Sequence, residues 1–252
     1  MSNGSAGLRQ APKAVINRGR QSGWLRFSDG SRPGFKGALR ETGARALTIF
    51  YRRVVFMSYP LDTAEIPVYH ANIDVEFRQL GVREIDDYLR FRPDCARRPI
   101  EQRIADGHRC FTSWHEGRII DACWSATKLV HVPYLDRYLD IPAGDVFSFD
   151  SFTVRAHRGH GVYMARNSFQ ARHDQANGLK RSIALVAREN HAAWLILSRS
   201  GLRTLGTYHY LRAPGKGLYW STPLEGESLP PLTSPRAAGR RRKTSMQAAR
   251  DT

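Results

Sequence analysis

The hydrophobic pattern of the chain becomes regular from residue 73 onward. Over 73–77, apolar residues alternate with charged ones, which is the period of a strand with one buried face. Apolar residues then recur at helical spacing over 82–89, and a second short helix is predicted over 100–105. This part of the chain is therefore expected to begin with one strand followed by two short helices.

Three further strands are predicted in the middle of the chain. Residues 110–114 and 119–130 flank the polar segment 115–118, whose glycine suits a hairpin turn. After a proline-containing loop, residues 146–154 form an apolar run that is interrupted only by short polar side chains. We expect this run to be a strand in the interior of a sheet.

Helices and strands alternate in the following segment. A helix is predicted to begin at Val162 and to end near Asn177, and a short buried strand follows over 182–186. Asn190 has a side chain suited to cap the N-terminus of a helix over 192–199.

The order of the elements predicts the fold class. Two closing strands, over 204–211 and 217–221, complete the order β-α-α-β-β-β-α-β-α-β-β. The strand–helix–strand unit 146–186 is expected to form a right-handed parallel crossover inside an otherwise antiparallel sheet. This is an α/β (α+β) fold with a mixed central sheet flanked by helices.

The two ends of the chain lack this regularity. Residues 1–35 and 223–252 are rich in Gly, Ser, Pro and Arg without an apolar period, so both are expected to be disordered basic tails. Residues 36–72 are expected to be a basic extension, with a helix predicted between residues 37 and 57. That helix either packs on the domain or rests on an anionic surface. The folded domain is then expected to span 73–222.

The charge of the chain narrows the choice of partners. The 252 residues carry a net charge of +16, which is the sign expected of a polyanion-binding protein. The charge is +5 over 1–35, +4 over 36–53, only +2 over 54–228 and +5 over 229–252. Because the predicted domain is almost neutral, no specific nucleic-acid partner is expected. The basic tails leave room for weak contact with a membrane surface or another polyanion.

The cysteines and the apolar segments of the chain indicate its cellular compartment. Cys95, Cys110 and Cys123 are odd in number and lack metal-ligand spacing, which favours a reducing cytosol over a disulfide scaffold and predicts no metal site. Residues 1–10 lack the apolar core of a secretory signal, and the apolar stretch 47–51 is too short to span a bilayer. The sequence therefore predicts a cytoplasmic protein.

The turn after the 146–154 strand carries the clearest chemistry. Arg158-Gly159-His160-Gly161 leads directly into a helix, whose first N–H groups are unpaired and carry positive dipole charge. The glycines let the backbone approach a phosphate, and Arg158 adds a charged donor. Taken alone, the turn indicates only an anion site, and a plain structural turn is the alternative. It matches neither the P-loop nor the dinucleotide fingerprint.

The residues around this loop resemble the GNAT (N-acetyltransferase) superfamily. Segment 149–154, loop 158–161, Glu189-Asn190 and Ser200-Gly201-Leu202 follow the family's order. That order is a hydrophobic strand, an Arg/Gln-x-x-Gly-x-Gly/Ala loop and an Asn-started helix ending in Gly-Phe. The resemblance covers roughly 73–221, with its specific motifs between 149 and 202. It implies a GNAT-type sheet in which two parallel strands splay apart to admit the pantetheine arm of an acyl-CoA.

The resemblance also implies roles for single residues. Val154 would lie near the thioester, with its N–H as oxyanion donor, and Asn190 would lie beside the pantetheine or the departing thiol. The co-substrate would be acetyl-CoA or another acyl-CoA. Its pyrophosphate would be bound by backbone N–H groups of the loop and helix start, at Arg158, Gly159, His160, Gly161, Val162 and Tyr163.

Two positions depart from the family pattern. Tyr163 replaces the last small residue of the loop, and Leu197 occupies a position where many relatives carry a tyrosine as general acid. The missing acid leaves water, Ser198 or Tyr208 as replacements, although an aromatic residue on a strand more often serves packing. Both departures bear on catalysis more than on cofactor binding.

Asp150 is the candidate base for the acceptor amine. It is the charged residue of a strongly apolar strand, and a buried carboxylate at this place is suited to general-base catalysis. The alternative, that Asp150 pairs structurally with an arginine or with backbone amides, is equally open.

These observations predict an N-acetyltransferase. It would transfer an acetyl or other acyl group from acyl-CoA to an amine of a small molecule or amino sugar, by direct attack in a ternary complex. Two alternatives stay open. One is a non-catalytic acyl-CoA-binding protein with a GNAT fold, favoured by Tyr163 and Leu197. The other is a basic-tailed protein that binds nucleic acid or a membrane surface.

Overall fold

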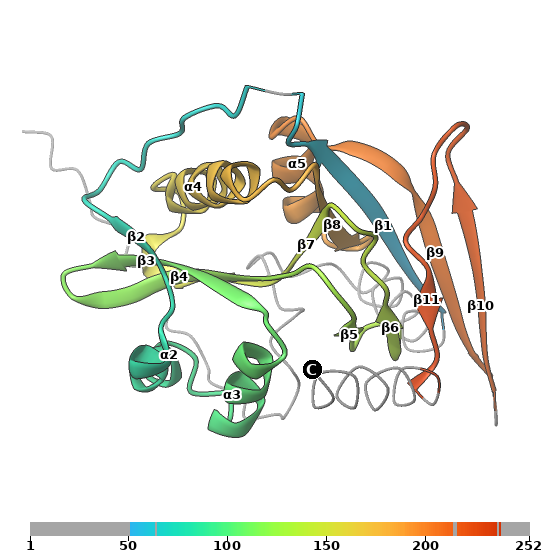
Figure 1. The fold of residues 1–252 in the computed structure, drawn as a ribbon, viewed down its shortest axis with the longest axis horizontal. Coiled ribbons are helices and arrows are strands. Elements are labelled where there is room, and N and C mark those ends of the chain that lie inside the picture. The colour runs from blue at the N-terminus through green and yellow to red at the C-terminus, as the bar shows by residue number, and fades with distance from the viewer. Residues whose placement is uncertain (1–50, 64, 214–215, 236, 238–252) are drawn as a thin grey trace, which may run out of the picture.

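The main sheet of the molecule has eight strands (Figure 1). The computed structural model describes residues 51–63, 65–213, 216–235 and 237. The strands of the main sheet are β1 (Tyr51–Pro60), β2 (Glu76–Gln79), β3 (Arg109–His115), β4 (Arg118–Ala126), β7 (Asp145–Thr153), β8 (Arg181–Ala187), β9 (Arg203–Ala213) and β10 (Lys216–Pro223). Their order is β10-β9-β1-β8-β7-β4-β3-β2, and β7 with β8 is the parallel pair among antiparallel neighbours.

Helices cover both faces of this sheet. Helices α2 (Ile85–Phe91) and α3 (Arg97–Ala105) lie on one face, and α4 (Val162–Ala176) and α5 (His191–Arg199) lie on the other (Figure 1). Short 3-10 turns, η1 (Val82–Glu84) and η2 (Arg155–His157), precede α2 and α4. The largest hydrophobic core lies between the sheet and the α2–α3 face, and its buried members include Phe56, Tyr88, Trp124 and Phe147. The predicted mixed sheet with a parallel pair and flanking helices is thus confirmed.

A second, smaller sheet packs on the same core. Its order is β11-β6-β5, with β5 (Val130–Val132), β6 (Arg137–Leu139) and β11 (Leu232–Thr233). The strand predicted over 119–130 is therefore broken, because β5 pairs with β6 instead of continuing β4. The tail predicted to be disordered from residue 223 also contains structure, since Leu232 packs on the core and β11 pairs with β6. Residues 1–35 and 238–252 of the predicted tails lie outside the described residues.

Strand β1 corrects the prediction for residues 36–72. Residues 51–60 form a strand between β8 and β9, where a helix was expected up to residue 57. The reason is burial on both faces: Val54 and Phe56 belong to the core beneath the α2–α3 face, and Val55 and Met57 pack with Leu197 of α5. A continuous apolar run of this kind is typical of an interior strand. The main sheet therefore begins at Tyr51 rather than at residue 73, and residues 37–50 of the expected helix lie outside the described residues.

A long connection leads from β1 over α4 to β2 (Figure 1). We call residues 65–75 of it the crossing segment. The hydroxyl of Ser168 on α4 donates to the carbonyl of Pro67, and the N–H of Asn72 donates to the carbonyl of His160 at 2.8 Å. Pairing of β2 with β3 begins only at Glu76, so the strand predicted over 73–77 starts later than expected. The crossing segment thus lies against both α4 and the loop that precedes it.

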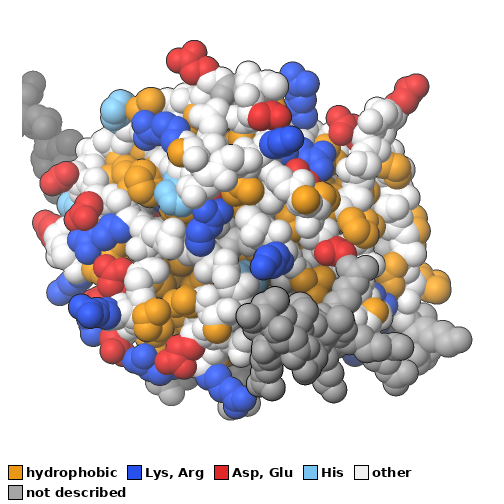
Figure 2. Space-filling model, viewed as in Figure 1, with side chains coloured by type: hydrophobic (Ala, Val, Ile, Leu, Met, Phe, Trp, Pro, Cys, Tyr) orange, Lys and Arg blue, Asp and Glu red, His pale blue; other side chains and the backbone are white. Residues whose placement is uncertain are grey.

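Charges of both signs are mixed on the surface. On the face in Figure 2, Lys and Arg side chains lie among Asp and Glu side chains and form no single-sign patch. This distribution agrees with the small net charge of residues 54–228. In the part of the chain that the structure describes, no helix combines the length and apolar character that a membrane span requires.

Helix α4 is fastened to the sheet by a buried ion pair. Arg166 and Asp121 are both fully buried, and Nε of Arg166 lies 2.9 Å from Oδ2 of Asp121 on β4. Arg166 also donates through Nη2 to the Ser151 hydroxyl at 2.8 Å and through Nη1 to Oε1 of Gln170 at 3.1 Å. The second oxygen of Asp121 accepts the Thr153 hydroxyl at 2.6 Å. One arginine therefore connects α4 with β4 and β7.

Replacing this arginine is expected to be costly. Arg166→Met leaves the Asp121 carboxylate buried without its cation, which lowers the free energy of unfolding by about 3–5 kcal/mol. The matched control is Arg172→Met on the exposed side of the same helix, with a change of less than about 0.5 kcal/mol. Urea denaturation of both variants measures the difference, and equal midpoints would show that the pair does not hold α4.

Candidate functional site

Strands β7 and β8 separate after a short paired stretch. Their parallel ladder joins residues 145–148 to 181–184 and then ends. On the other side of β7, Ala122 pairs with Phe152 and Trp124 with Phe149, so Asp150 and Ser151 together lie opposite Cys123. This is a β-bulge, and Asp150 has a left-handed φ of 50°. The bulge bends β7 at the point where its pairing with β8 stops.

A cavity of about 740 Å³ lies at this split. It is lined on one side by α4, α5 and the crossing segment, which we call the α4–α5 side. On the other side it is lined by Tyr134, Phe149, Asp150 and Phe152, which we call the α2–α3 side. Because side chains from both faces of the sheet line one cavity, the cavity extends through the gap between β7 and β8.

The loop before α4 ends on the α4–α5 side of the cavity. Arg158, Gly159 and Gly161 line it, and a Cβ placed on Gly159 would meet no atom within 4 Å. The backbone N–H groups of residues 159–164 have no acceptor in the part of the chain that the structure describes. Unpaired N–H groups at the start of a 15-residue helix, beside open space, form an anion site.

Gly161 is required for two reasons. Its φ of 76° is left-handed, and a Cβ there would approach the carbonyl oxygen of His70 in the crossing segment to 3.0 Å. The loop therefore needs glycine both for its own conformation and for contact with the crossing segment.

No model of a protein family matches the chain, and no curated protein matches it. Among solved structures, a GNAT-family acetyltransferase from Colwellia psychrerythraea is similar, with 16% identity and a TM-score of 0.44 over 67% of this chain and 59% of that chain. A GCN5-related N-acetyltransferase from Sphaerobacter thermophilus has 15% identity and a TM-score of 0.45 over 77% of this chain and 58% of that chain.

A conserved protein of unknown function from Staphylococcus epidermidis is also similar, with 13% identity and a TM-score of 0.41 over 73% of this chain and 69% of that chain. The match spans less than two thirds of both acetyltransferase chains. Likenesses this distant bear on neither activity nor substrate. The chain's own geometry has the features that the resemblance implies: a parallel pair that separates, a glycine loop opening α4, and a helix capped by Asn190.

The arrangement of the sheet and helices therefore agrees with the fold that the resemblance implies.

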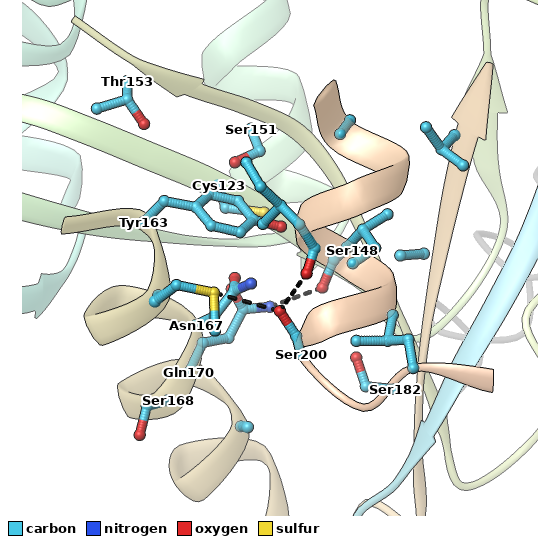
Figure 3. A pocket seen from close by; sticks show the side chains of 18 of the residues that line it. Cys123, Ser148, Ser151, Thr153, Tyr163, Asn167, Ser168, Gln170, Ser182 and Ser200 are labelled. Carbon is cyan, nitrogen blue, oxygen red and sulfur yellow. Dashed lines mark hydrogen bonds between the residues drawn. The ribbon is translucent and has the colours of Figure 1, made fainter. Parts of the chain in front are cut away.

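Asn190 and Tyr163, which the resemblance implies as cofactor contacts, both line the cavity. Asn190 lines the cavity, and its Oδ1 accepts the N–H of Ala193 at 3.1 Å, which confirms the predicted helix cap. Tyr163 projects into the cavity toward Cys123 and Ser151 (Figure 3). The guanidinium of Arg166 lies 5.0 Å from the centre of its ring, and burial raises the pKa of the Tyr163 hydroxyl. The Tyr163 side chain is thus part of the cavity wall.

Asp150 faces the α2–α3 side and is held by two arginines. Its Oδ1 lies 3.1 Å from Nη1 of Arg92, and its Oδ2 lies 2.6 Å from Nη1 of Arg103. Asp150 and Arg92 are both more than nine-tenths buried. Because both carboxylate oxygens already accept from guanidinium groups, the geometry favours structural pairing over the role of a free base.

The other predicted residues are less involved in the cavity. Val154 does not line it, and its N–H donates to the carbonyl of Ile120 at 2.8 Å, which occupies the predicted oxyanion donor. Tyr208 lies outside the cavity lining, and its hydroxyl donates to the carbonyl of Pro230 at 2.7 Å. His160 also lies outside the lining, and its carbonyl accepts from Asn72.

The helix that begins at Asn190 has apolar residues facing the cavity. Leu197 lines it and packs with Val55, Met57 and Val186, whereas Ser198 is exposed and outside the lining. The position of the missing tyrosine therefore carries no hydroxyl. Among the described residues, no group of three or more His, Cys, Asp or Glu side chains is placed to hold a metal ion.

Sequence reasoning missed Tyr134, a residue near the split. Tyr134, in the connection between β5 and β6, lines the cavity, and its hydroxyl donates to Oε2 of Glu189 at 3.2 Å. Glu189 directly precedes Asn190. The resemblance includes this glutamate in its motif, but nothing local in the sequence connects it with a tyrosine 55 residues earlier in the chain.

The ion pairs of Asp150 lead to a prediction about stability. Asp150→Asn removes the charge that compensates the buried Arg92, so the free energy of unfolding is expected to fall by about 2–4 kcal/mol. Asp86→Asn is the matched control, because its ion pair with Arg97 is solvent-exposed and worth less than about 1 kcal/mol. Urea denaturation measures the free energy of unfolding of both variants. A value for Asp150→Asn equal to that of the wild type would argue against a structural role of Asp150.

A second prediction concerns Asp174, a cavity-lining residue on α4. Its Oδ1 lies 2.9 Å from Nη2 of Arg109, but burial outweighs this charge and raises the pKa of Asp174 to about 6. The folded state therefore binds a proton more tightly than the unfolded state, whose carboxyl has a pKa of about 3.9. The stabilising effect is complete below about pH 4 and is lost as the pH rises through about 6.

The test is the pH dependence of unfolding. Between pH 4 and 6.5, the wild type should lose on the order of 2–3 kcal/mol relative to Asp174→Asn, which cannot titrate. The free energy of unfolding is compared between the two proteins at each pH, so that contributions shared by both cancel. One such contribution comes from His173, whose pKa is lowered by burial and by Arg109. Parallel curves for the two proteins would contradict the assignment.

Proposed function

We propose that this chain is an acyl-CoA-dependent N-acyltransferase of the GNAT superfamily, with acetyl-CoA as co-substrate. The proposal is supported above all by one observation: the cavity begins at unpaired N–H groups of a helix start and continues through a gap between two parallel strands. The volume of about 740 Å³ lies within the usual range for small-molecule sites.

The α4–α5 side is suited to the cofactor. A pyrophosphate at the loop would accept from the N–H groups at Gly159 to Tyr163 and from Arg158, in the field of the α4 dipole. Beyond Ser148 and Ala184, β7 and β8 no longer pair with each other. The amides of a pantetheine arm can pair with their facing edges, as an added strand would.

The α2–α3 side is suited to the acceptor. Once the thioester lies in the gap, an amine entering past Phe149 and Phe152 can attack its carbonyl carbon directly in a ternary complex. We propose a small amine or amino sugar as acceptor. Cys95, Cys110 and Cys123 are all free thiols, which supports action in a reducing compartment such as the cytoplasm.

A non-catalytic acyl-CoA-binding protein is the second candidate. It is favoured by Leu197, which offers no proton to the departing thiolate, and by Tyr163, whose side chain takes part of the cavity wall next to the loop. A thiol is a tolerable leaving group without a strong acid, so the transferase remains the better-supported function.

Binding of acetyl-CoA tests the cofactor site. Isothermal titration calorimetry should detect binding to the wild type, and Arg158→Met should weaken it about 10-fold, because one charge-assisted contact to the pyrophosphate is lost. Arg155→Met is the control: this exposed arginine lies three residues earlier, outside the cavity lining, and its replacement should leave the affinity unchanged.

Thiol release from acetyl-CoA across a panel of amines tests the reaction. Release with at least one amine is the expected result. Failure of the wild type to bind acetyl-CoA would overturn the family assignment, whereas binding without release from any amine would support the non-catalytic candidate.

A further inference from the structure

The proposed reaction needs a group that removes protons from the amine. Asp150 has both oxygens engaged by arginines, and Tyr208 is bound to Pro230 outside the cavity. Tyr134 also lines the cavity on the α2–α3 side, and its hydroxyl is bound to the carboxylate of Glu189.

Tyr134 is held in a defined position by contacts with two residues, Arg52 and Glu189. Its backbone carbonyl accepts from Nη1 of Arg52 at 2.7 Å, and the Arg52 guanidinium lies 5.1 Å from the centre of its ring. Its hydroxyl donates to Oε2 of Glu189 at 3.2 Å. Arg52 belongs to β1, whereas Glu189 follows β8. Tyr134 therefore reaches from the small sheet to the carboxyl end of the strand that forms one edge of the split.

The environment of this pair suits proton transfer. Burial, together with the neighbouring Glu189 carboxylate, raises the pKa of Tyr134 above its usual value, against the smaller opposing charges of Arg52 and Arg53. The hydroxyl therefore stays protonated at neutral pH and is able to receive one proton while handing on its own. The Glu189 side chain is exposed, so a proton that it receives can pass to solvent.

We propose that Tyr134 contacts the acceptor amine in the cavity and relays its proton to Glu189. This inference rests on the proposed acyl transfer. Tyr134 is then a catalytic residue, and Glu189, which acts through it, is a positioning residue that holds the hydroxyl and takes up the proton. The acceptor class is a primary amine that arrives as its ammonium form.

The steps balance without any further reactant. The ammonium gives one proton to the Tyr134 hydroxyl as that hydroxyl gives its own proton to Glu189. The neutral amine attacks the thioester carbonyl carbon, the N–C bond forms and the C–S bond breaks. The remaining surplus proton on nitrogen goes to the thiolate, which leaves as CoA thiol, and Glu189 releases its proton to water.

The competing explanation is that Tyr134 only closes the small sheet over the core. Tyr219 provides the comparison, because its hydroxyl donates at 2.9 Å to the carbonyl of Leu135, the next residue of the same connection, and Tyr219 does not line the cavity. Loss of the Tyr219 hydroxyl perturbs the packing of this connection without touching the proposed site.

The experiment compares Tyr134→Phe and Glu189→Gln with the controls Tyr219→Phe and Glu225→Gln. For an amine that supports thiol release by the wild type, kcat/KM is measured from pH 5.5 to 9.5, with acetyl-CoA affinity by calorimetry. Both test variants should lose about 10²–10³-fold in kcat while binding acetyl-CoA as the wild type does. The pH profile of kcat/KM should differ from that of the wild type in both test variants, because both interrupt the same proton path.

Further outcomes separate this inference from the proposed function. The double variant should be no slower than Tyr134→Phe alone, because the two residues act as one unit, and Glu189→Asp should recover part of the rate. The relay would be overturned if both test variants kept the rates and pH profiles of the wild type. It would also be overturned if Tyr219→Phe lost as much kcat as Tyr134→Phe. Neither result would contradict the proposed acyl transfer. A wild type that releases no thiol with any amine would overturn both. Glu189 is exposed, so its variants remain informative if Tyr134→Phe folds poorly.

Discussion

The break in register at Asp150 and Ser151 is the constraint on which the site depends. Two residues of β7 lie opposite one residue of β4, so β7 turns away from β8 just after their short parallel ladder. A regular strand would continue the ladder and close the sheet, and no space would open between the two edges. The bulge also places Phe149 and Asp150, which are adjacent in sequence, on the same side of the cavity.

The polar groups around the bulge hold it from both faces. On the α4–α5 side, Arg166 donates to Ser151 and pairs with Asp121, and on the α2–α3 side, Arg92 and Arg103 pair with Asp150. The left-handed φ of 50° at Asp150 is unfavourable for a residue other than glycine and is kept only where its surroundings fix it. The buried charges thus maintain a local geometry that the strand would not adopt alone.

Local chemistry explains what could be predicted from the sequence. The Asn190 cap, the glycine loop and the apolar run of β7 each depend on neighbouring residues, and each was identified in its correct place. Strand β1 was missed because its first buried residue, Val54, continues a helical spacing of apolar residues that begins at Leu39. Only the place of the strand between β8 and β9 shows that both of its faces are buried. The ion pairs of Asp150 and the contact between Tyr134 and Glu189 join residues far apart in the chain, so no local pattern indicates them.

The position of β1 also has a consequence for how the chain folds. Val54 must pair with Ala187 and with Tyr208, although it is made long before either, so the centre of the sheet has a high contact order. During synthesis, the apolar residues 54–57 are translated well before β8 and β9, so they have no pairing strand until both have been made. Folding is therefore expected to be slow, and this apolar strand is exposed to aggregation before the sheet closes.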